Sequence, residues 1–439
     1  MADSARLLAA RRLLRVEEEG AYVSRLTKGG DVNRRAIALV AGVTRWKRWL
    51  DHVAGRFVRG GIGRLDAPVL HALRIGTFEL VVEGVPAHAA VGEAVGVARE
   101  LSHKGGAGLV NAVLRKVAGV ARNAPEGPQT GDPADDLAVR WSHPTWMVRR
   151  WLDRWGEGAT RDLLERNNAV PRYSLRVNPL RTTGLSFAAR LEALGVEPEP
   201  GRWSEASWRV SRLQPVVADG LLRDGHCAVQ DEAATLVGLV LDPQPGESVL
   251  DGAAAPGGKA LHAAERMGNE GAVLAVDRNA AKADLVAVAA AAHGATIVRT
   301  VAADLRQVAA AHAGRHDRVL LDAPCSGTGV LAKRADLRWR RTPGELAELT
   351  ALQDELLDAA ALAVAPGGLL VYATCSLEPE ENEARVAAFI ERTPSFILEP
   401  VPASLPEPLR DGAFYRALPH LHGTDGAFAA RLRHVPDPR

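Results

Sequence analysis

Residues 250–259 read LDGAAAPGGK, and this stretch decides the fold of the C-terminal half. It begins at the end of a short apolar run that is typical of a strand, and it leads into a helical segment. Small residues at such a turn let the backbone approach a ligand, and the first N–H groups of the helix can bind an anion. A P-loop needs Gly five residues before Gly258 and Ser or Thr after Lys259, but Ala253 and Ala260 stand there. The stretch therefore predicts a nucleotide-type site that is not a P-loop.

Four more apolar runs follow in this half of the chain, at residues 273–276, 296–298, 319–321 and 369–372. Helical segments rich in Ala, Leu and Glu separate them. Strands that alternate with helices are typical of a parallel sheet with helices on both faces. We therefore expect a Rossmann-like α/β domain over residues 231–439.

Aspartates stand at or after the ends of four predicted strands: Asp251, Asp277, Asp304 and Asp322. Asp277 follows Asp251 by 26 residues, and an acidic residue in this place typically accepts hydrogen bonds from ribose hydroxyls. One such Asp is weak evidence, because Asp is also a common helix cap. Four together favour a cofactor that carries adenosine.

Two of the three cysteines also follow predicted strands directly, where an open α/β sheet presents its reactive groups. Cys325 lies in DAPCSGTG at 322–329, and Cys375 lies in ATCS at 373–376. A pair of thiols in these places suggests covalent chemistry on an electrophilic ring. Three cysteines without a CxxC pair predict neither a disulfide framework nor a zinc site, so we expect a reducing cytoplasm and no metal.

The first part of the chain has the periodicity of helices over residues 5–121. Val110, Val113, Leu114 and Val117 fall on one helical face, and Asp66 followed by Pro68 is typical of a helix start. Breaks are predicted at residues 28–31 and 59–63. We expect an all-α domain of about five helices.

Charge is distributed unevenly along the chain. Residues 1–122 carry a formal charge of +9 and the remaining residues carry −8, although the formal net charge of the chain is only +1. A basic front domain is expected of a module that binds phosphates. A helical domain with Arg-rich solvent faces gives the same balance, so charge alone leaves both interpretations open.

Between these parts, residues 123–136 are rich in Pro, Gly, Asp and Gln and predict a linker. Residues 137–169 interleave Trp with Arg, and the Trp side chains at helical spacing favour a core over base-stacking platforms. Short strands at 173–177 and 208–210, with a helix at 187–194 between them, predict a small α+β subdomain over 137–230. The expected division is thus 1–122, 123–136, 137–230 and 231–439.

The first residues lack the basic-then-apolar order of a signal peptide. The longest uncharged apolar stretch, residues 359–377, is interrupted by PGG at 366–368, which predicts a helix end, a turn and a strand. We therefore expect no membrane span.

The blocks AAPGGK at 254–259, DAPCSGTG at 322–329 and ATCS at 373–376 resemble, in this order, the signature motifs of the NOL1/NOP2/Sun family of RNA cytosine-5 methyltransferases. RVNP at 176–179, QDEA at 230–233 and GTDGAF at 423–428 resemble that family too. The front domain is similar to NusB, a helical RNA-binding protein, in VPAHAAV at 85–91 and NAVLR at 111–115. Over nearly the whole chain, the combination resembles the bacterial RsmB/Sun-type small-subunit rRNA methyltransferases. Ala253 departs from the family, which has Cys there, and Ala427 replaces a Phe.

The resemblance implies an all-α NusB-like N-terminal domain, a small α+β subdomain and a Rossmann-like domain that uses S-adenosylmethionine. It also implies that Cys375 adds to C6 of a cytosine and that Cys325 assists product release. DNA cytosine methyltransferases attack with the Cys of a Pro-Cys block, so the presence of Cys375 as well is what favours RNA. Lys259 is the candidate source of positive potential, and Asp322 is the candidate group that stabilises charge at N3 and O2 of the base. The expected cofactor-binding residues are Ala253, Ala254, Ala255, Pro256, Gly257, Gly258, Lys259, Asp277, Asp304 and Asp322.

The resemblance further implies 16S rRNA as the substrate, naked or in an early assembly particle. We expect a cytoplasmic monomer that binds neither DNA nor a membrane. Arg140, Arg149, Arg150 and Arg176 are candidate contacts to the RNA backbone. Two alternatives stay open: a tRNA cytosine-5 methyltransferase, and a non-catalytic NusB-type RNA-binding or antitermination factor. The retained cysteines, Lys259 and Asp322 argue against the second.

Overall fold

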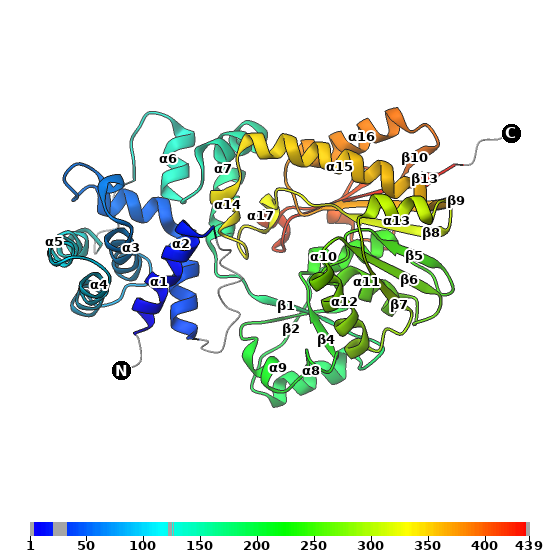
Figure 1. Ribbon diagram of the computed structural model, residues 1–439, viewed down its shortest axis with the longest axis horizontal. Helices are drawn as coiled ribbons and strands as arrows, with labels where there is room; N and C mark the ends of the chain where they lie inside the picture. Colours follow the sequence, from blue (N-terminus) through cyan, green and yellow to red (C-terminus); the bar gives the residue numbers. More distant parts are fainter. Residues whose placement is uncertain (1–3, 21–32, 122–124, 126, 436–439) are drawn as a thin grey trace. The chain divides into compact units, whose positions relative to one another are not determined.

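The computed structural model describes residues 4–20, 33–121, 125 and 127–435 (Figure 1). The chain divides into two compact units. A helical unit comprises Met1–Ala169 together with Leu331–Arg340, and an α/β unit comprises Val170–Val330 together with Arg341–Arg439. In the described part of the chain, no helix is long and apolar enough to cross a membrane.

The front of the helical unit holds five α-helices among the described residues, as the sequence predicts. They are α1 (Ala5–Glu18), α2 (Arg34–Gly55), α3 (Ala67–Val81), α4 (Ala87–Leu101) and α5 (Lys104–Ala121), with a 3-10 turn, η2 (Ile62–Arg64), after α2. Helix α3 begins directly after Asp66 and has Pro68 in its first turn, where the missing proline N–H is not needed. The predicted break at 59–63 is confirmed, and the one at 28–31 lies outside the described residues.

The apolar face predicted for α5 holds this helix in the bundle. Val110, Val113, Leu114 and Val117 are all buried, and burial of one such side chain contributes about 1.5–3 kcal/mol. Helix α3 approaches this face closely at Gly76, where an added Cβ would lie 2.4 Å from Leu114 Cδ1. A larger residue at position 76 would push the two helices apart.

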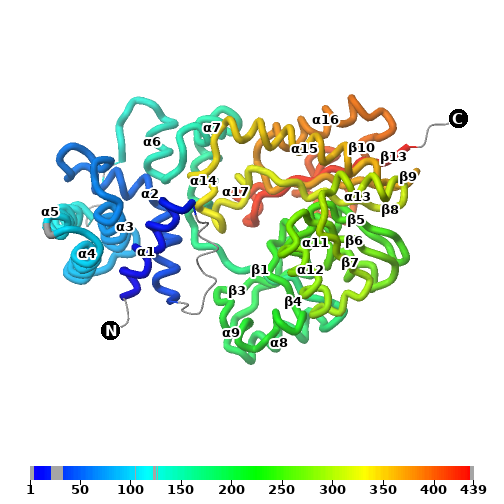
Figure 2. Tube along the Cα trace, viewed as in Figure 1, coloured from blue at the N-terminus to red at the C-terminus, as the bar shows by residue number. Residues whose placement is uncertain are grey.

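The helical unit is completed by segments that are distant in the sequence. They are α6 (Pro133–Arg140), α7 (Thr145–Asn168) and residues 331–340 with the short helix α14 (Leu337–Arg340), and Figure 2 shows α14 beside α7. Arg338 is fully buried and donates hydrogen bonds to Ser142 O (3.0 Å), Asn168 Oδ1 (2.8 Å) and Asn167 O (3.1 Å). These bonds give both terminal nitrogens of a buried guanidinium a partner, so Arg338 fixes residues 331–340 to this unit.

Helix α6 begins at Pro133, inside the segment 123–136 that was expected to be a linker. Asp132 caps this helix by accepting a hydrogen bond from Ala134 N (3.1 Å), and Pro133 occupies the first helical position. Asp followed by Pro is a helix-start signal as well as a loop signal, and here it starts a helix.

The α/β unit begins with a small antiparallel sheet in the order β2-β3-β1-β4. Its strands are β1 (Tyr173–Val177), β2 (Glu199–Pro200), β3 (Ser207–Val210) and β4 (Cys227–Val229), and its helices are α8 (Gly184–Ala193) and α9 (Gln214–Ala218). This chain order and strand order give a ferredoxin-like βαββαβ arrangement. The two strands and the helix predicted here are confirmed to within three residues.

A nine-stranded sheet forms the rest of the α/β unit. Its strands are β5 (Ser248–Asp251), β6 (Ala272–Asp277), β7 (Val298–Ala302), β8 (His316–Asp322), β9 (Val364–Thr374), β10 (Phe396–Glu399), β11 (Arg410–Asp411), β12 (Phe414–Ala417) and β13 (Ala427–His434). They follow the order β11-β12-β13-β9-β8-β5-β6-β7, and β10 pairs with β13. Strands β5 to β9 are mutually parallel, as predicted, whereas β13 is antiparallel to β9.

Helices cover both faces of this sheet, which confirms the doubly wound prediction. They are α10 (Glu232–Leu241), α11 (Gly258–Arg266), α12 (Ala280–His293), α13 (Leu305–Ala311), α15 (Pro343–Ala363) and α16 (Glu383–Arg392), with α17 (Pro419–His422) and the 3-10 turns η3 (Thr328–Val330), η4 (Pro379–Glu381) and η5 (Glu407–Leu409) in the connections. Val249 packs in a core with α10, α11 and α12, and Leu250 packs in a second core with α13, α15 and α16. Successive residues of a strand point to opposite faces, so the apolar run of β5 feeds both cores.

Two predicted strand positions need correction. The strand expected at 296–298 is β7 at Val298–Ala302, because its hydrogen-bonding partner β6 pairs Val273 with Val298 and Asp277 with Ala302. The turn expected at 366–368 lies inside β9, where the register with β8 shifts between His316 and Arg318. An irregularity of this kind accommodates Pro and Gly without ending the strand.

The boundary between the compact units falls after Ala169. It differs from the expected boundaries at 136/137 and 230/231, because α6 and α7 group with the front helices. The four-part division into 1–122, 123–136, 137–230 and 231–439 stays a prediction.

Candidate active site

The parallel strands bring the predicted site residues to one edge of the large sheet. Asp251 ends β5, Asp277 ends β6, Asp322 ends β8, and Cys375 directly follows β9. Strand β5 lies between β6 and β8, although β6 and β7 follow it in the chain before β8 does. Ligands of open α/β sheets bind at the carboxyl ends of the strands where the strand order reverses in this way.

The two cysteines lie against each other at this edge. Cys325 Sγ and Cys375 Sγ are 3.4 Å apart, within hydrogen-bond distance for sulfur, and both side chains are partly exposed. The hydrogen bond with Cys375 and burial together raise the pKa of Cys325 well above its usual value. Cys325 therefore keeps its proton at neutral pH and can donate it to Cys375 in a hydrogen bond.

The third cysteine belongs to another part of the α/β unit. Cys227 begins β4 of the small sheet and is 1% exposed. Burial raises its pKa to about 12. Cys227 is thus a core residue and a natural control for thiol chemistry.

Lys259 and Asp322 form an ion pair in the same region. Lys259 lies in the first turn of α11, and its Nζ donates to Asp322 Oδ2 at 2.6 Å. Burial alone would lower the pKa of Lys259, but the negative charges of Asp322, Asp251 and Cys375 outweigh this and raise it. Lys259 is therefore a fixed positive charge within electrostatic reach of Cys375.

Asp251 is a buried carboxyl group without a protein partner. It is 1% exposed, and neither carboxyl oxygen has a hydrogen-bond partner among the described residues. Burial first, and then the charge of Asp322, raise its pKa to about 7; the N–H of Ala253 offsets part of this rise without reaching hydrogen-bond geometry. A buried polar group without a partner costs free energy, so this site is suited to a ligand that brings a hydrogen-bond donor or a positive charge.

The turn between β5 and α11 brings backbone close to this edge. Gly257 caps α11 with φ of +106°, a conformation that favours glycine, and an added Cβ would meet Val286 at 3.2 Å. The N–H groups at the start of α11, the unpartnered Asp251 and the strand-end Asp277 together fit a cofactor such as S-adenosylmethionine, with its ammonium group and ribose. The binding roles of residues 253–259 stay a prediction.

Two strand-end aspartates already have local partners. Asp277 accepts a hydrogen bond from Asn279 N (2.9 Å), and Asp304 caps α13 and accepts a bond from Arg306 Nη2 (2.7 Å). The hydrogen bonds from Arg306 lower the pKa of Asp304 to about 2. Asp304 is thus a helix cap, and its contact with a cofactor stays a prediction.

The proposed RNA contact by Arg176 is wrong. Its side chain is fully buried, forms an ion pair with Glu265 and donates to Gly258 O (3.1 Å). Arg176 therefore supports the turn between β5 and α11. Arg140 and Arg149 are exposed, Arg140 lies over the ring of Trp49 and Arg149 pairs with Asp132; contacts of Arg140, Arg149 and Arg150 with RNA stay predictions.

A buried polar network near the two cysteines was not predicted from the sequence. Glu381 and Asn382 follow Cys375 by a few residues and are both fully buried. Glu381 accepts a hydrogen bond from Ser326 N (2.8 Å), and Asn382 Nδ2 donates to Ser376 O (3.0 Å). The run EPEEN at 378–382 has the composition of a solvated turn, and only its position after Cys375 in the chain could have indicated a role.

Two glycines of the family blocks are explained by close backbone contact. An added Cβ at Gly329 would lie 2.7 Å from both Cys375 O and Gly426 Cα. Gly329 N donates to Cys375 O (3.0 Å), and Gly426 N donates to Gly329 O (2.8 Å). The GTG and DG motifs therefore support the loop that carries Cys375.

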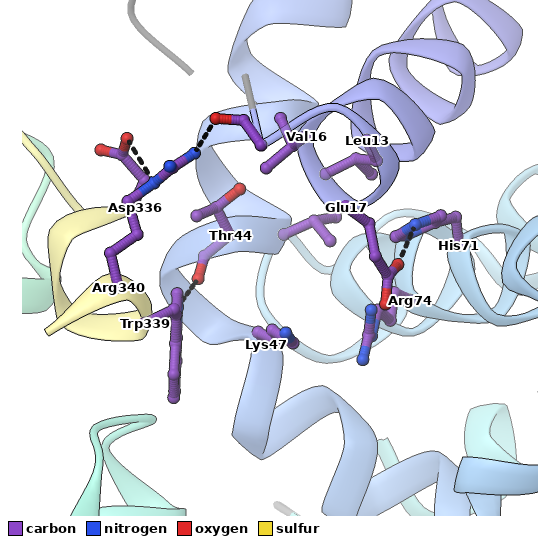
Figure 3. A pocket seen from close by; sticks show the side chains of 12 residues that line it. Leu13, Val16, Glu17, Thr44, Lys47, His71, Arg74, Asp336, Trp339 and Arg340 are labelled. Carbon is purple, nitrogen blue, oxygen red and sulfur yellow. Dashed lines mark hydrogen bonds and ion pairs between the residues drawn. The ribbon is translucent and has the colours of Figure 1, made fainter. Parts of the chain in front are cut away.

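A pocket of about 290 Å³ in the helical unit contains none of the predicted site residues (Figure 3). Side chains of α1, α2, α3 and α14 line it. Glu17 pairs with His71 (2.8 Å), Asp336 with Arg340 (3.7 Å), and Trp339 Nε1 donates to Thr44 O (2.7 Å). Its charged groups are thus largely paired with one another.

Known proteins match this chain in three consecutive parts. The profile of the NusB family matches residues 3–119, that of a ferredoxin-like domain of RsmF/B-like methyltransferases matches 143–217, and that of the 16S rRNA methyltransferases RsmB/F matches 238–433. The probable ribosomal RNA small subunit methyltransferase B of Bacillus subtilis is 34% identical over 98% of both chains. The chain belongs to the RsmB/F family of methyltransferases.

Solved structures agree with this membership. The crystal structure of PH0851 covers 98% of this chain and 99% of its own, with a TM-score of 0.80 at 27% identity. A methyltransferase homologue from Pyrococcus horikoshii covers 69% of this chain and all of its own, with a TM-score of 0.60 at 28% identity. As a member of the RsmB/F family, the protein is a methyltransferase that uses S-adenosylmethionine.

The partnerless Asp251 leads to a prediction about stability. We expect Asp251→Asn to raise the free energy of unfolding of the cofactor-free protein at pH 8, by up to about 4 kcal/mol. The pKa of Asp251 is raised to about 7 from the ordinary 3.8, so its contribution to stability is present below about pH 4 and is lost as the pH rises to 7. Urea unfolding at pH 5 and pH 8 measures the difference between variant and wild type, which should grow with pH. An equal difference at both values would contradict the prediction.

Proposed function

We propose that this protein methylates C5 of a cytosine in 16S rRNA through a transient covalent bond between Cys375 and the base. The observation that carries the proposal is the pair of sulfurs 3.4 Å apart at the ends of neighbouring parallel strands. An ion pair of Lys259 and Asp322 lies at the same edge. The family membership supports methyl transfer, and the two thiols support a nucleophilic mechanism.

The covalent step is needed because C5 of cytosine is a weak nucleophile. When the thiolate of Cys375 bonds to C6, the electron pair of the C5–C6 double bond becomes available at C5. Bound S-adenosylmethionine supplies the electrophilic methyl group. After methylation, loss of the C5 proton and breakage of the S–C6 bond restore the ring and return the electron pair to Cys375.

An ordinary thiol is only a few per cent ionised at neutral pH, so the site must favour the thiolate of Cys375. Lys259 supplies positive charge within electrostatic reach, and the S–H of Cys325 is placed to donate a hydrogen bond. Asp322, which is paired with Lys259, is the proposed hydrogen-bond partner of N3 as negative charge builds on the base.

Cys325 is the proposed proton acceptor for the release step. Its pKa is raised first by the hydrogen bond with Cys375, then by burial and by the charge of Cys375. When Cys375 is bonded to carbon, the hydrogen bond and the charge are both removed, so Cys325 can lose its proton to solvent. Its thiolate then accepts the C5 proton as the S–C6 bond breaks.

The proposed substrate is inferred from the names of the relatives and from the positive charge of the front domain. Relatives that cover most of the chain are named small subunit methyltransferases, and the basic front domain matches the NusB family. The base must leave any stack to reach the cysteines, so a loop or single strand of RNA is the expected target. We further propose a cytoplasmic monomer that does not bind DNA.

Transfer of a labelled methyl group to defined RNAs tests the substrate. We expect incorporation into 16S rRNA, naked or in an early small-subunit particle, with the label at one cytosine that bisulfite sequencing detects as protected. Transcribed tRNA is the control. Methylation of tRNA but of neither form of 16S rRNA would overturn the substrate, and a methyl group on another atom of the base would overturn the C5 assignment.

A further inference from the structure

Glu381 is a buried carboxylate with no part in the chemistry described above. It ends the 3-10 turn η4, six residues after Cys375, and is fully buried. Its Oε1 accepts hydrogen bonds from Ser326 N (2.8 Å) and Gln353 Nε2 (3.0 Å), and its Oε2 accepts one from Ser326 Oγ. A buried carboxylate with three donors is held in one position.

Two of these three bonds hold the residue next to Cys325. Ser326 donates hydrogen bonds to Glu381 through both its backbone N–H and its hydroxyl. The backbone next to Cys325 therefore has little freedom to move. Gln353 of α15 also donates to Pro324 O (2.9 Å) on the other side of Cys325. Glu381 and Gln353 together hold the Cys325 loop from 324 to 326.

The loop that carries Cys375 is held by a different side chain. Thr374 Oγ1 donates to Asn382 Oδ1 (2.6 Å), and Asn382 Nδ2 donates to Ser376 O (3.0 Å). Among the described residues, the side chain of Glu381 makes no hydrogen bond to residues 374–376; its link to that loop runs through Ser326 Oγ, 3.1 Å from Ser376 Oγ. Glu381 at the end of η4 and Asn382 before α16 thus hold the Cys325 loop and the Cys375 loop through different direct partners.

We propose that Glu381 is a positioning residue for Cys325, acting on release of the methylated base and not on formation of the bond to Cys375. The inference rests on the covalent mechanism proposed above. Glu381 fixes where the sulfur of Cys325 stands relative to the C5 proton. Its negative charge also makes that sulfur a stronger base after Cys375 has bonded to carbon.

The charge of Glu381 adds to the rise in the pKa of Cys325, behind the hydrogen bond with Cys375, burial and the charge of Cys375. The other titratable or charged groups around Cys325 and Glu381 are Tyr372 on β9, Arg341 before α15, Asp354 on α15 and Arg385 on α16. Lys259 interacts electrostatically with Asp322 and with Cys375. None of these is changed by substitution of Glu381, so a shift in the pH dependence of release would report on Glu381 itself.

The test uses Glu381→Gln in the full-length protein, with Glu380→Gln as the matched control from the same turn. Single-turnover reactions with RNA and S-adenosylmethionine are stopped at intervals, and the protein–RNA adduct and the free methylated RNA are separated on denaturing gels. For Glu381→Gln we expect adduct formation within about twofold of wild type and release slowed at least about tenfold, since a misplacement of about 1 Å can cost about 10²-fold. The adduct should therefore accumulate, and the pH midpoint of release should move to lower pH. Glu380→Gln should behave as wild type.

Equal slowing of adduct formation and release in Glu381→Gln would overturn the inference, as would release at the wild-type rate. If Glu381→Gln does not fold, Ser326→Ala removes one of the same bonds and should shift the balance toward the adduct in the same direction. The Cys325→Ala variant separates the two proposals. If it traps an adduct and neither Glu381→Gln nor Ser326→Ala does, Glu381 has no role in release; if no variant ever forms an adduct, the covalent mechanism itself fails.

Discussion

Replacement of Cys375 by Ala should reduce methyl transfer to RNA by at least about 10⁴-fold, to the background of the assay. The nucleophile is lost, and we expect that Cys325 does not replace it, because burial and the charge of Glu381 still raise the pKa of its thiol when the hydrogen bond with Cys375 is gone. Transfer of a labelled methyl group to rRNA measures the loss. Binding of S-adenosylmethionine should change little, since the residues predicted to bind it lie between Ala253 and Asp322 and do not include Cys375.

Cys227→Ala is the matched control for that experiment. Cys227 is buried in the small sheet and takes no part in the proposed chemistry. The variant should keep full activity per folded molecule, with some loss of stability from the smaller side chain. If Cys375→Ala retained its activity, the nucleophile would be Cys325. The Cys of a Pro-Cys block has this role in DNA cytosine methyltransferases.

Replacement of Cys325 by Ala should have a different effect: a covalent protein–RNA complex should accumulate. Bond formation by Cys375 and methylation can still occur, but the acceptor for the C5 proton is missing, so release slows by about 10²–10⁴-fold. A band of protein plus RNA on a denaturing gel should form with wild-type RNA and S-adenosylmethionine. It should disappear in the double variant with Cys375→Ala.

The Cys325→Ala variant also lacks the thiol that lies within hydrogen-bond distance of Cys375 Sγ. We therefore expect slower formation of the trapped complex at pH 7 than at pH 8.5, where an ordinary thiol is about half ionised. A Cys325→Ala protein that turns over normally, with no trapped complex at either pH, would remove the release role from Cys325.

The parts of the fold that repeat simple patterns could be predicted from the sequence. Apolar runs of strand length and the turn at 250–259 indicated the parallel sheet, and the same pattern placed Asp251, Asp322 and Cys375 at one edge, because parallel strands end together. The stripe of Val110, Val113, Leu114 and Val117 indicated the packing of α5. Roles for the two cysteines came from resemblance and not from spacing.

The remainder depends on contacts between residues that are distant in the sequence. Arg176 looked like a surface cation, yet Glu265 from α11 covers it. Arg338 lies in the C-terminal half of the chain but is held by Ser142 and Asn168 of the helical unit. Glu381 resembles a surface acid in an acidic turn until its bonds to Ser326 are known. No local pattern distinguishes such buried charges from exposed ones.

Reaction with an RNA substrate whose target cytosine carries fluorine at C5 tests the covalent bond to Cys375 most directly. Fluorine cannot leave as a cation, so the methylated adduct cannot lose its C5 substituent and the S–C6 bond persists. In the presence of S-adenosylmethionine, wild-type protein should form a denaturant-stable complex whose mass is that of protein, RNA and one methyl group, with the RNA fragment attached to Cys375, and Cys375→Ala should form none. Failure of the folded wild-type protein to become attached, while it still methylates the unfluorinated RNA, would contradict the account.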